Sequence, residues 1–598
     1  MCGIAGIVTV ETQGAEAAEA LGRMHGSLRH RGPDGSGCWQ SPGGAASFAH
    51  TRLAVFDPSP LGQQPMSADP FTITYNGAIY NFRALRQSLE QAGVRFRTQA
   101  DTEVILRLYE RWGTDGLDRL RGMFALAIWD EAAQTCVLAR DRFGIKPVYY
   151  SASASRLLFA SEVRALVASR LVSRELDPEG AYGYFRTGSV PEPLTLLRDV
   201  RCLGAGQWLA WGRGRLSLHQ FAEVSLAASD APAGEPVALA SAALEESVDH
   251  HLAGDREVAV FLSGGIDSTA LVALARRRGH DRLQTLSMSL PGTADDEGPE
   301  ARRIAGIFGT RHHECAVTAA SARDLVPSFL AAMDQPSIDG LNTFVMSRFA
   351  QACGVRVVLS GIGADELFGG YPTFRGVPRL ASWHARLALA NPLVAAGGRI
   401  LERLAPGVRS RRVGDMLRQP PGLATAYATY RAMYTRAEAT TLGAQYTGVA
   451  ITPPTEPADA VPGETPLDAV GRLELSRYVR NQLLRDGDVM SMAAGVELRT
   501  PYLDQPLVST LARIPAATRC EPGKRLLLRA VPEIPGWVGH QRKRCFQFPF
   551  EQWLGAEWQD VFGPPGRADV VPAQTWYRAW SVLALEHWMR TTVGTSHA

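Results

Sequence analysis

The stretch VAVFLSGGIDSTALVALA, residues 258–275, decides the fold of the second half of the chain. It combines a short apolar run, a glycine-rich turn and a helical pattern, which together are the strand–turn–helix unit of a parallel sheet. The same alternation recurs further along, with apolar runs at 283–290 and 355–359 and helical segments at 302–308 and 344–351. We therefore predict an α/β fold with a doubly wound parallel sheet.

The turn after this first strand, Ser263-Gly264-Gly265-Ile266-Asp267-Ser268, has the composition of a phosphate site. Successive backbone N–H groups and a helix N-terminus bind anionic oxygens. Because no Gly-Lys-Ser/Thr follows, the turn is not a Walker A loop, and Asp267 indicates a metal-bridged pyrophosphate instead. A glycine-rich connector with an aspartate helix cap is the alternative interpretation.

A second strand end carries matching residues, Ser360-Gly361-Ile362-Gly363-Ala364-Asp365. Ligands of open α/β sheets bind at the carboxyl edge of the strands, where this segment and the first turn are expected to meet. We predict that the site binds ATP and Mg²⁺, with Asp267 and Asp365 sharing the metal ion.

Lysine is scarce, with only three lysines among 62 basic residues. An ammonium group is a compact charge that the planar guanidinium of arginine does not always replace, so these positions are candidates for function. Lys543 is predicted to neutralise charge on a transferring phosphate group. Lys524 is expected to support or contact the same site, whereas a structural role fits Lys146 at least as well. For the runs that contain Lys524 and Lys543, a solvated basic surface is the alternative.

The first part of the chain, to about residue 210, reads as many short strands separated by turn clusters. The predicted strands are 3–10, 46–56, 71–75, 124–129, 136–140, 148–150 and 157–160. Helical periodicity appears mainly at 84–92 and 103–112. This pattern predicts an α+β sandwich of antiparallel sheets with flanking helices.

Length and composition indicate a folded chain of more than one domain. With 598 residues, 45% of them apolar and 20% charged, the chain is too long for one core and is neither disordered nor a disulfide scaffold. We predict one domain at 1–215, a linker at 216–238 and a second domain at 239–598. Residues 376–470 are expected to form a helical insertion with loops, without chemistry of their own.

Charge and cysteine usage bear on partners and compartment. A formal net charge of +2 gives no reason to expect nucleic acid or an anionic membrane, so small-molecule partners are predicted. The eight cysteines include no CxxC pair, which argues against a zinc site or a disulfide framework. No apolar run reaches the roughly 18 residues of a membrane span, and no signal peptide is evident. We expect a cytoplasmic protein. The sequence is compatible with a homodimer and does not decide the oligomeric state.

Cys2 directly follows the initiator methionine. Removal of Met1 would expose a thiol whose own α-amine serves as general base, as in amino-terminal nucleophiles. Asn76 and Gly77 could receive a tetrahedral oxyanion. Arg52 could bind an α-carboxylate and Asp101 an α-ammonium, so the set describes an amino-acid amide. Each of these residues also has an ordinary interpretation. Cys2 could be a buried small side chain, and Asn76-Gly77 could be a hairpin turn. Arg52 could be a surface cation and Asp101 a helix cap.

Taken in order, these motifs resemble the glutamine-dependent asparagine synthetase family, in which a class II glutamine amidotransferase domain precedes an ATP-pyrophosphatase domain. The resemblance runs nearly from end to end and implies an amino-terminal-nucleophile sandwich in the first domain. It rests on Cys2-Gly3-Ile4, Arg29 to Asp34, His50 to Leu53, Tyr75-Asn76-Gly77, Gly122-Met123-Phe124, Arg140 to Gly144, Ser263 to Ser268, Ser360 to Tyr371, Met490-Ser491-Met492, Glu497, Arg499 and Pro501 to Asp504.

The resemblance implies a role for each candidate residue. Cys2 would attack the amide of glutamine, Asn76 and Gly77 would form the oxyanion hole, and ammonia would pass through an internal tunnel. Arg52 and Asp101 would hold the glutamine backbone. In the second domain a carboxylate would attack the α-phosphate of ATP, giving an acyl-adenylate and pyrophosphate. Mg²⁺ would lie at Asp267 and Asp365, and Lys543 would neutralise charge. The ATP site so implied comprises Leu262, Ser263, Gly264, Gly265, Asp267, Ser268, Met288, Ser360 and Gly361.

The chain departs from the family pattern at three places. Ala78 stands where the family has a glutamate in the glutamine pocket, which removes a carboxylate facing the substrate ammonium. Ile362 stands where asparagine synthetases carry a glutamate near the acceptor, and an apolar side chain cannot make its polar contacts. Near Lys543, Gln541 and Cys545 replace the arginine and glycine of the family.

Three functions are compared. The first is asparagine synthesis from aspartate, glutamine and ATP, with AMP, pyrophosphate and glutamate as the other products. The second is the same mechanism on another carboxylate in a specialised pathway, which Ile362 and the 376–470 insertion favour. The third is a non-catalytic binding or scaffold protein, which the presence of Cys2, both acids and Lys543 argues against. A relative that closes a β-lactam is disfavoured because Cys2 is intact.

Overall fold

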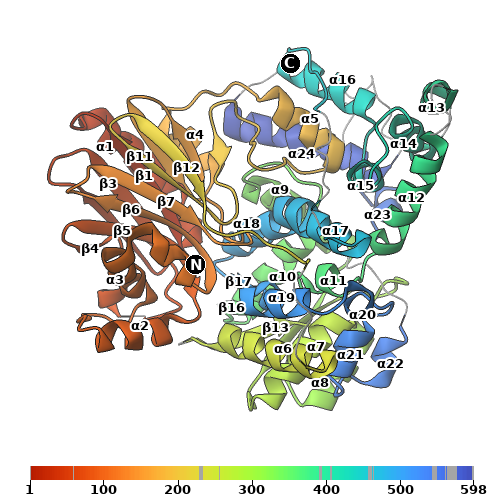
Figure 1. Ribbon diagram of the computed structural model, residues 1–598, viewed down its shortest axis with the longest axis horizontal. Coiled ribbons are helices and arrows are strands. Elements are labelled where there is room, and N and C mark those ends of the chain that lie inside the picture. The colour runs from red at the N-terminus through yellow and green to blue at the C-terminus, as the bar shows by residue number, and fades with distance from the viewer. Residues whose placement is uncertain are drawn as a thin grey trace.

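The computed structural model describes residues 2–594 except 58, 228–233, 255, 389–392, 405–406, 455–460, 462, 542–547, 556, 559–560 and 562–574. Its N-terminal and C-terminal parts lie side by side. The strands of the first part are on the left of Figure 1, and the helix-rich second part is on the right.

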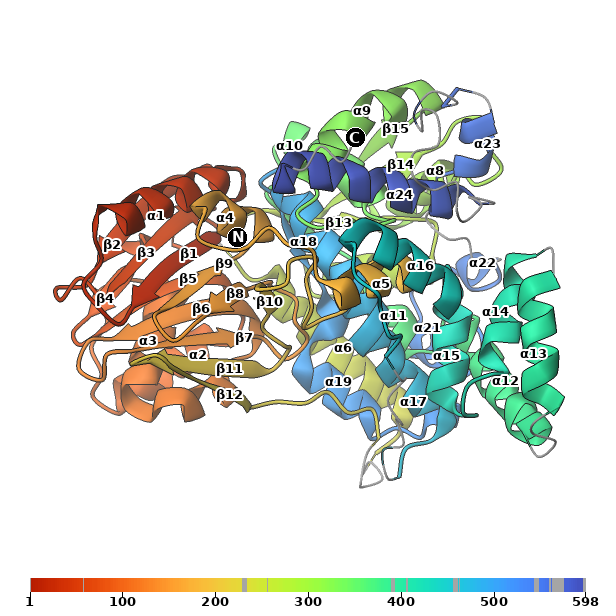
Figure 2. The same cartoon turned by 90° about the horizontal axis from the view of Figure 1, so that it is seen from above.

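The N-terminal part contains two six-stranded antiparallel sheets, with orders β10-β8-β9-β1-β3-β2 and β12-β11-β7-β6-β5-β4. The predicted antiparallel α+β sandwich is confirmed (Figure 2). Its strands are β1 (Gly3–Thr9), β2 (Gly35–Gln40), β3 (Ala46–Arg52), β4 (Met66–Ala68), β5 (Phe71–Ile79), β6 (Gly122–Asp130), β7 (Thr135–Arg140), β8 (Tyr149–Ala152), β9 (Arg156–Ala160), β10 (Arg201–Cys202), β11 (Gln207–Gly212) and β12 (Arg215–Gln220). Its helices are α1 (Ala15–Ser27), α2 (Phe82–Gln91), α3 (Asp101–Trp112), α4 (Val163–Ser169) and α5 (Pro178–Thr187).

Side-chain alternation along the strands explains how these layers pack. In β1, Ile4 and Val8 belong to the apolar cluster between the two sheets, which also contains Trp211. Ile7 points to the other side and packs with Met24 of α1. Because both faces of this strand are covered, its residues are almost all buried.

The C-terminal part is built on a five-stranded sheet of order β15-β14-β13-β16-β17, in which every pair is parallel. Its strands are β13 (Val258–Phe261), β14 (Gln284–Ser289), β15 (Arg311–Ala316), β16 (Val357–Leu359) and β17 (Glu497–Arg499). The predicted doubly wound parallel sheet is confirmed. The strand order reverses at β13, so the loops after β13 and β16 flank the switch point at which such sheets bind ligands.

Helices surround this sheet and continue into a separate helical group on the right of Figure 1. The helices that pack near the sheet are α6 (Pro236–Leu252), α7 (Ile266–Arg277), α8 (Gly298–Phe308), α9 (Ala319–Ala332), α10 (Leu341–Ala352), α11 (Ala364–Leu367), α18 (Arg485–Met492) and α19 (Gln505–Ala512). The helical group comprises α12 (Thr373–Ala388), α13 (Leu393–Leu404), α14 (Val408–Met416), α15 (Leu423–Arg431), α16 (Arg436–Thr447) and α17 (Pro466–Leu473). The last part contains α20 (Ala516–Arg519), α21 (Arg525–Ala530), α22 (Gly536–Gly539), α23 (Phe550–Gly555) and α24 (Trp576–Trp588). Among the described helices, none combines the length and apolarity that crossing a membrane requires.

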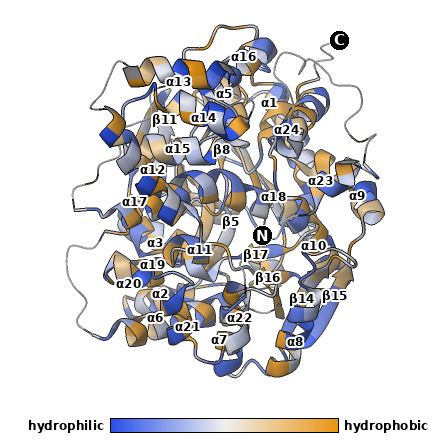
Figure 3. Cartoon of the chain, turned by 90° about the vertical axis from the view of Figure 1, so that its right-hand side faces the viewer, coloured by the Kyte–Doolittle hydropathy of each residue, from blue (hydrophilic) through white to orange (hydrophobic). Residues whose placement is uncertain are grey.

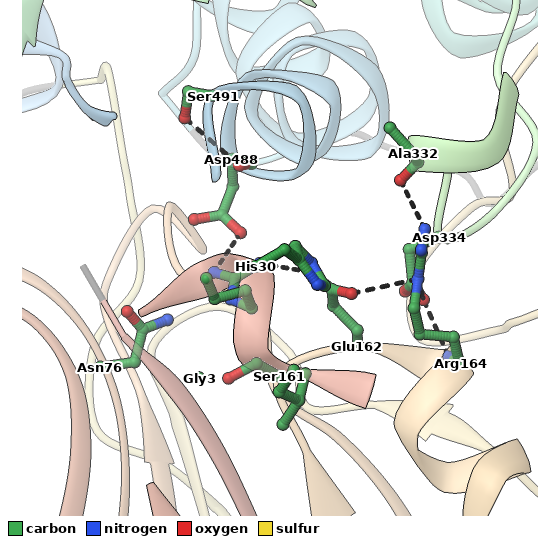
Figure 4. A network of polar contacts seen from close by, with 12 residues as sticks. Gly3, His30, Asn76, Ser161, Glu162, Arg164, Ala332, Asp334, Asp488 and Ser491 are labelled. Carbon is green, nitrogen blue, oxygen red and sulfur yellow. Dashed lines mark hydrogen bonds and ion pairs between the residues drawn. The ribbon is translucent and has the colours of Figure 1, made fainter. Parts of the chain in front are cut away.

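Two buried cations of the N-terminal part meet one aspartate of the C-terminal part. Arg31, which is 0% exposed, donates to Glu162 Oε1 at 2.8 Å and to Asp488 Oδ2 at 2.7 Å. Lys146 Nζ lies 3.1 Å from the other oxygen of Asp488. Figure 4 shows Asp488 pointing from α18 toward the segment that holds His30. These pairs fix α18 against the sandwich, and Lys146 has the structural role that we considered for it.

Replacing Asp488 by asparagine should destabilise the protein. The change leaves two buried cations without their shared carboxylate, and removing one partner of a buried pair costs roughly 3–5 kcal/mol. Urea denaturation should show the loss as a lower midpoint. Glu175→Gln, which breaks an ion pair between exposed side chains, is the matched control and should leave the midpoint almost unchanged. Equal curves for Asp488→Asn and the wild type would contradict a stabilising role for the pair.

Candidate functional site

Cys2 immediately precedes β1, and both its backbone nitrogen and its backbone carbonyl form hydrogen bonds to side chains. Its nitrogen donates to Asn76 Oδ1 at 2.9 Å, and its carbonyl accepts from Arg31 Nε at 3.1 Å. The side chain is only 8% exposed, and burial raises the pKa of the Cys2 thiol. A buried thiol of this kind needs a nearby base before it acts as a nucleophile.

Asn76 and Gly77 lie within β5 rather than in a hairpin turn, because that strand continues to Ile79. Asn76 pairs with Ala125 across the sheet, and its buried Nδ2 has no hydrogen-bond partner among the described residues. At Gly77 an added Cβ would lie 2.1 Å from the carbonyl oxygen of Met123, so only glycine fits between these strands. The arrangement leaves a buried amide donor beside Cys2, as an oxyanion hole requires.

Arg52 and Asp101 are both buried, and burial excludes the surface-cation alternative for Arg52. Arg52 ends β3 and donates to the carbonyl oxygens of Ser59, at 2.8 Å, and of Asp57. Asp101 is the first residue of α3, and the cap residue is Ala100. Its Oδ2 accepts from the Tyr75 hydroxyl at 2.9 Å and from the Ile79 nitrogen at 3.1 Å. Burial raises the pKa of Asp101 from 3.8 to about 6.

Hydrogen bonds of Ser263 and Ser268 stabilise the glycine-rich loop after β13. Ser263 Oγ lies 3.0 Å from Ser268 Oγ and accepts from the nitrogen of Gly265 at 3.1 Å. The nitrogen of Gly264 donates to Glu297 Oε2 at 3.2 Å. Gly265 is the cap residue of α7, so the loop leads directly into a helix N-terminus as the sequence predicted.

Lys524 joins the two loops of the switch point. Its Nζ lies 2.5 Å from Asp267 Oδ1 and 2.5 Å from Asp365 Oδ1. Burial alone would lower the pKa of Lys524, but the two carboxylates raise it above its ordinary value. One cation therefore already bridges these acids, and two carboxylates converging in this way fit a Mg²⁺ ion that also binds phosphate oxygens.

A cavity of about 2130 Å³ adjoins this edge of the sheet, and its wall includes Ser263, Gly265, Asp267, Asp365 and Lys524. The other residues expected at the ATP site lie in or behind these loops. Leu262 and Met288 are buried in the core, and Ser360 donates its backbone N–H to the carbonyl of Arg499. Gly361 follows Ser360, and a Cβ added there would lie 3.1 Å from the Cβ of Asp267. Lys543 lies outside the described residues.

Ile362 packs against the apolar clusters on both sides of the parallel sheet. It is not among the residues that line the cavity. An apolar side chain is well suited to this environment, whereas a carboxylate there would need a polar partner.

Sequence reasoning did not identify the residues that hold the site together. Arg31 lies within the motif Arg29 to Asp34, but nothing in the pattern shows that it contacts Cys2 and Asp488. Asp488 stands two residues before Met490 and carries no separate signal. The bridge from Lys524 to both acids was expected only as general support or contact, and lysine scarcity was its only sign.

The architecture defines a class of enzyme: a glutamine amidotransferase domain joined to a nucleotide-binding synthetase domain. The profile of the glutamine amidotransferase domain matches residues 1–222, and that of asparagine synthase matches residues 240–564. The chain belongs to the glutamine-hydrolysing asparagine synthetase family. The members of this family are ligases that use ATP and take the amide nitrogen from glutamine.

Named relatives match most of the chain. A Mycobacterium tuberculosis protein, provisionally named asparagine synthetase (glutamine-hydrolyzing), is 34% identical and covers 93% of this chain and 89% of its own. Asparagine synthetase (glutamine-hydrolyzing) 3 of Bacillus subtilis is 30% identical, over 86% of this chain and 81% of its own. Asparagine synthetase B of Escherichia coli is 31% identical, over 64% and 67% respectively.

Stability should depend on pH through Asp101. Because its folded pKa of about 6 exceeds the ordinary 3.8, the folded state keeps a proton that the unfolded chain releases as pH rises from about 4 to 6. The contribution of Asp101 to the free energy of unfolding should therefore fall by roughly 3 kcal/mol over this window. Asp101→Asn lacks this contribution, so its stability should fall less steeply with pH than that of the wild type. Urea midpoints measured from pH 4 to 7 test the difference, and parallel pH profiles for both proteins would contradict it.

Proposed function

We propose that the protein hydrolyses glutamine at Cys2 and uses the ammonia to convert aspartate into asparagine, with cleavage of ATP to AMP and pyrophosphate. The observation that carries the proposal is the unpartnered, buried Nδ2 of Asn76 beside the fixed backbone of Cys2. A donor that is left without a partner in the interior costs free energy, which an incoming oxyanion would recover.

In the glutaminase step, the Cys2 sulfur attacks the side-chain amide carbon of glutamine. The α-amine of Cys2, once Met1 is removed, takes the thiol proton and passes it to the leaving ammonia. Asn76 Nδ2 and the Gly77 backbone stabilise the tetrahedral oxyanion. Water then cleaves the thioester and releases glutamate. Arg52 binds the α-carboxylate and Asp101 the α-ammonium, a contact that Asp101 makes only when it is ionised.

In the synthetase step, an oxygen of the acceptor carboxylate attacks the α-phosphorus of ATP and pyrophosphate leaves. Ammonia then attacks the acyl carbon, AMP leaves, and the amide remains. The loop Ser263 to Ser268 binds phosphate oxygens, and Lys524 holds Asp267 and Asp365 in place. These two carboxylates would hold Mg²⁺, which supplies positive charge to the phosphate oxygens. We assign charge neutralisation on the reacting phosphate to Lys543.

A continuous apolar cluster between the two parts supports transfer of ammonia within the molecule. One continuous hydrophobic cluster contains Leu53, Ala78 and Met123 from the N-terminal part. The same cluster contains Leu359 and Met492 from the C-terminal part. A route lined by such residues offers few groups that would protonate ammonia and keep it in place.

Ile362 favours a second candidate, in which the same mechanism amidates a carboxylate other than aspartate. Ile362 packs in apolar surroundings, so the chain lacks the glutamate that the family carries near an aspartate acceptor.

The acceptor is tested with purified full-length protein, glutamine, ATP, Mg²⁺ and aspartate, with asparagine, AMP and glutamate followed together by mass spectrometry. We expect one asparagine for each AMP. Glutamate without asparagine or AMP would overturn aspartate as acceptor and leave the second candidate.

Cys2→Ala should abolish glutamine-dependent amidation, by about 10³-fold or more, because no other group can form the thioester. With ammonium chloride in place of glutamine, acceptor-dependent AMP formation should be unchanged. Cys38→Ala, which alters an exposed cysteine of the same domain, is the matched control and should behave as wild type. Full glutamine-dependent activity in Cys2→Ala would contradict the assignment of the nucleophile.

A further inference from the structure

The cavity at the nucleotide loop is larger than the proposed substrates require. Its volume of about 2130 Å³ is roughly twice the upper end of the 300–1,000 Å³ found for small-molecule sites. The phosphate loop and the two acids lie at one end. Residues of α5, α12, α14 and α24 line the same cavity away from that loop.

Four arginines on the helical group line this outer part. Arg375 and Arg379 are one turn apart on α12, and Arg409 and Arg412 are one turn apart on α14, so each helix presents a pair on one face. In the described part of the chain, no carboxylate forms an ion pair with any of the four. Arg412 donates to the carbonyl of Ala432, and its buried Nε has no partner among the described residues.

Two acids of the helical group, Asp415 and Glu438, are already paired with other cations. Arg186 Nη2 lies 3.4 Å from Asp415 Oδ2. Glu438 is shared by Arg411 Nη1, at 2.8 Å, and Arg578 Nη2, at 2.9 Å. Burial lowers the pKa of Arg412, Tyr577 opposes this shift, and repulsion from Arg186, Arg578 and Arg409 adds to the lowering. Glu179, Asp339 and Glu551 also line the cavity, so an anion would be bound by the four guanidinium groups of α12 and α14 and not by the net charge of the wall.

Three acids of the cavity wall are also paired with cations. Asp267 and Asp365 are bridged by Lys524, and Glu192 is paired with Arg140 at 2.9 Å. These three carboxylates therefore have cationic partners of their own and are not paired with the four arginines on α12 and α14.

We infer that Arg375, Arg379, Arg409 and Arg412 bind a distal anionic group of an acceptor larger than aspartate, an oligocarboxylic acid of peptide size. The inference rests on the second candidate for the proposed function, amidation of a carboxylate other than free aspartate, and the reacting carboxylate would be the inner end of this molecule. One carboxylate of the acceptor would react at the nucleotide. The four guanidinium groups would bind its other carboxylates through charge-assisted hydrogen bonds.

The test uses the full-length protein with Mg²⁺ and a non-hydrolysable ATP analogue, so that the phosphate-binding loop is occupied. Triglutamate is titrated by calorimetry, with trialanine as the probe that has the same backbone length but no side-chain carboxylates. The variant is Arg375→Ala/Arg379→Ala/Arg409→Ala, whose three side chains are exposed and whose fold is checked by its thermal midpoint. Arg386→Ala is the control, because this exposed arginine lies on α12 but does not line the cavity.

We expect triglutamate to bind the wild type at least tenfold more tightly than trialanine does, with an affinity that falls as salt is added. The triple variant should lose about tenfold or more of the affinity for triglutamate, and Arg386→Ala should lose none. Equal binding of the two probes, or of triglutamate to the triple variant and the wild type, would overturn the inference.

Failure of the distal anion site and failure of the proposed amidation give different results. Asparagine formation without a preference for triglutamate would leave the amidation in place and remove only the distal anion site. Tight, arginine-dependent binding of triglutamate in a protein that forms no AMP with any acceptor would support the distal site and overturn the amidation.

Discussion

The buried guanidinium of Arg31 is the interaction on which the rest of the structure depends. It bonds three groups from separate segments: the carbonyl of Cys2, the carboxylate of Glu162 and the carboxylate of Asp488. A cation taken out of water is tolerated only when its partners are well placed, so these three segments cannot move independently. The position of the candidate nucleophile is thereby tied to α18, which belongs to the synthetase part.

The second constraint is the order of strands in the parallel sheet. Because β13 and β16 are neighbours, loops almost a hundred residues apart in sequence meet at one edge. Lys524, from a third segment, bonds an acid in each loop. The two sites are therefore built in the same way: in each, a buried cation, Arg31 or Lys524, bonds segments that are distant in the chain. Apolar packing between the two parts then encloses what lies between them.

Local patterns predicted what depends on neighbouring residues. The run 258–262 and the glycine-rich turn predicted a strand, a loop and a helix because burial and turn chemistry act over a few positions. Two strands of the parallel sheet were missed for physical reasons: β15 is a polar edge strand (Figure 3), and β17 has three residues. In the N-terminal part, β2, β4, β10, β11 and β12 were missed as well. The pairing of Asp488 with Arg31 and the arginines of the cavity wall could not be predicted, because they depend on how distant helices pack.

The close approach of β5 and β6 at Gly77 also has an evolutionary consequence. A side chain at this position would meet the backbone of Met123 whether or not glutamine is hydrolysed. A lineage that lost the nucleophile would therefore still be selected for glycine here, because the strand spacing demands it. Among divergent descendants, retention of this glycine would report an intact sheet, and only retention of the cysteine would report a working glutaminase.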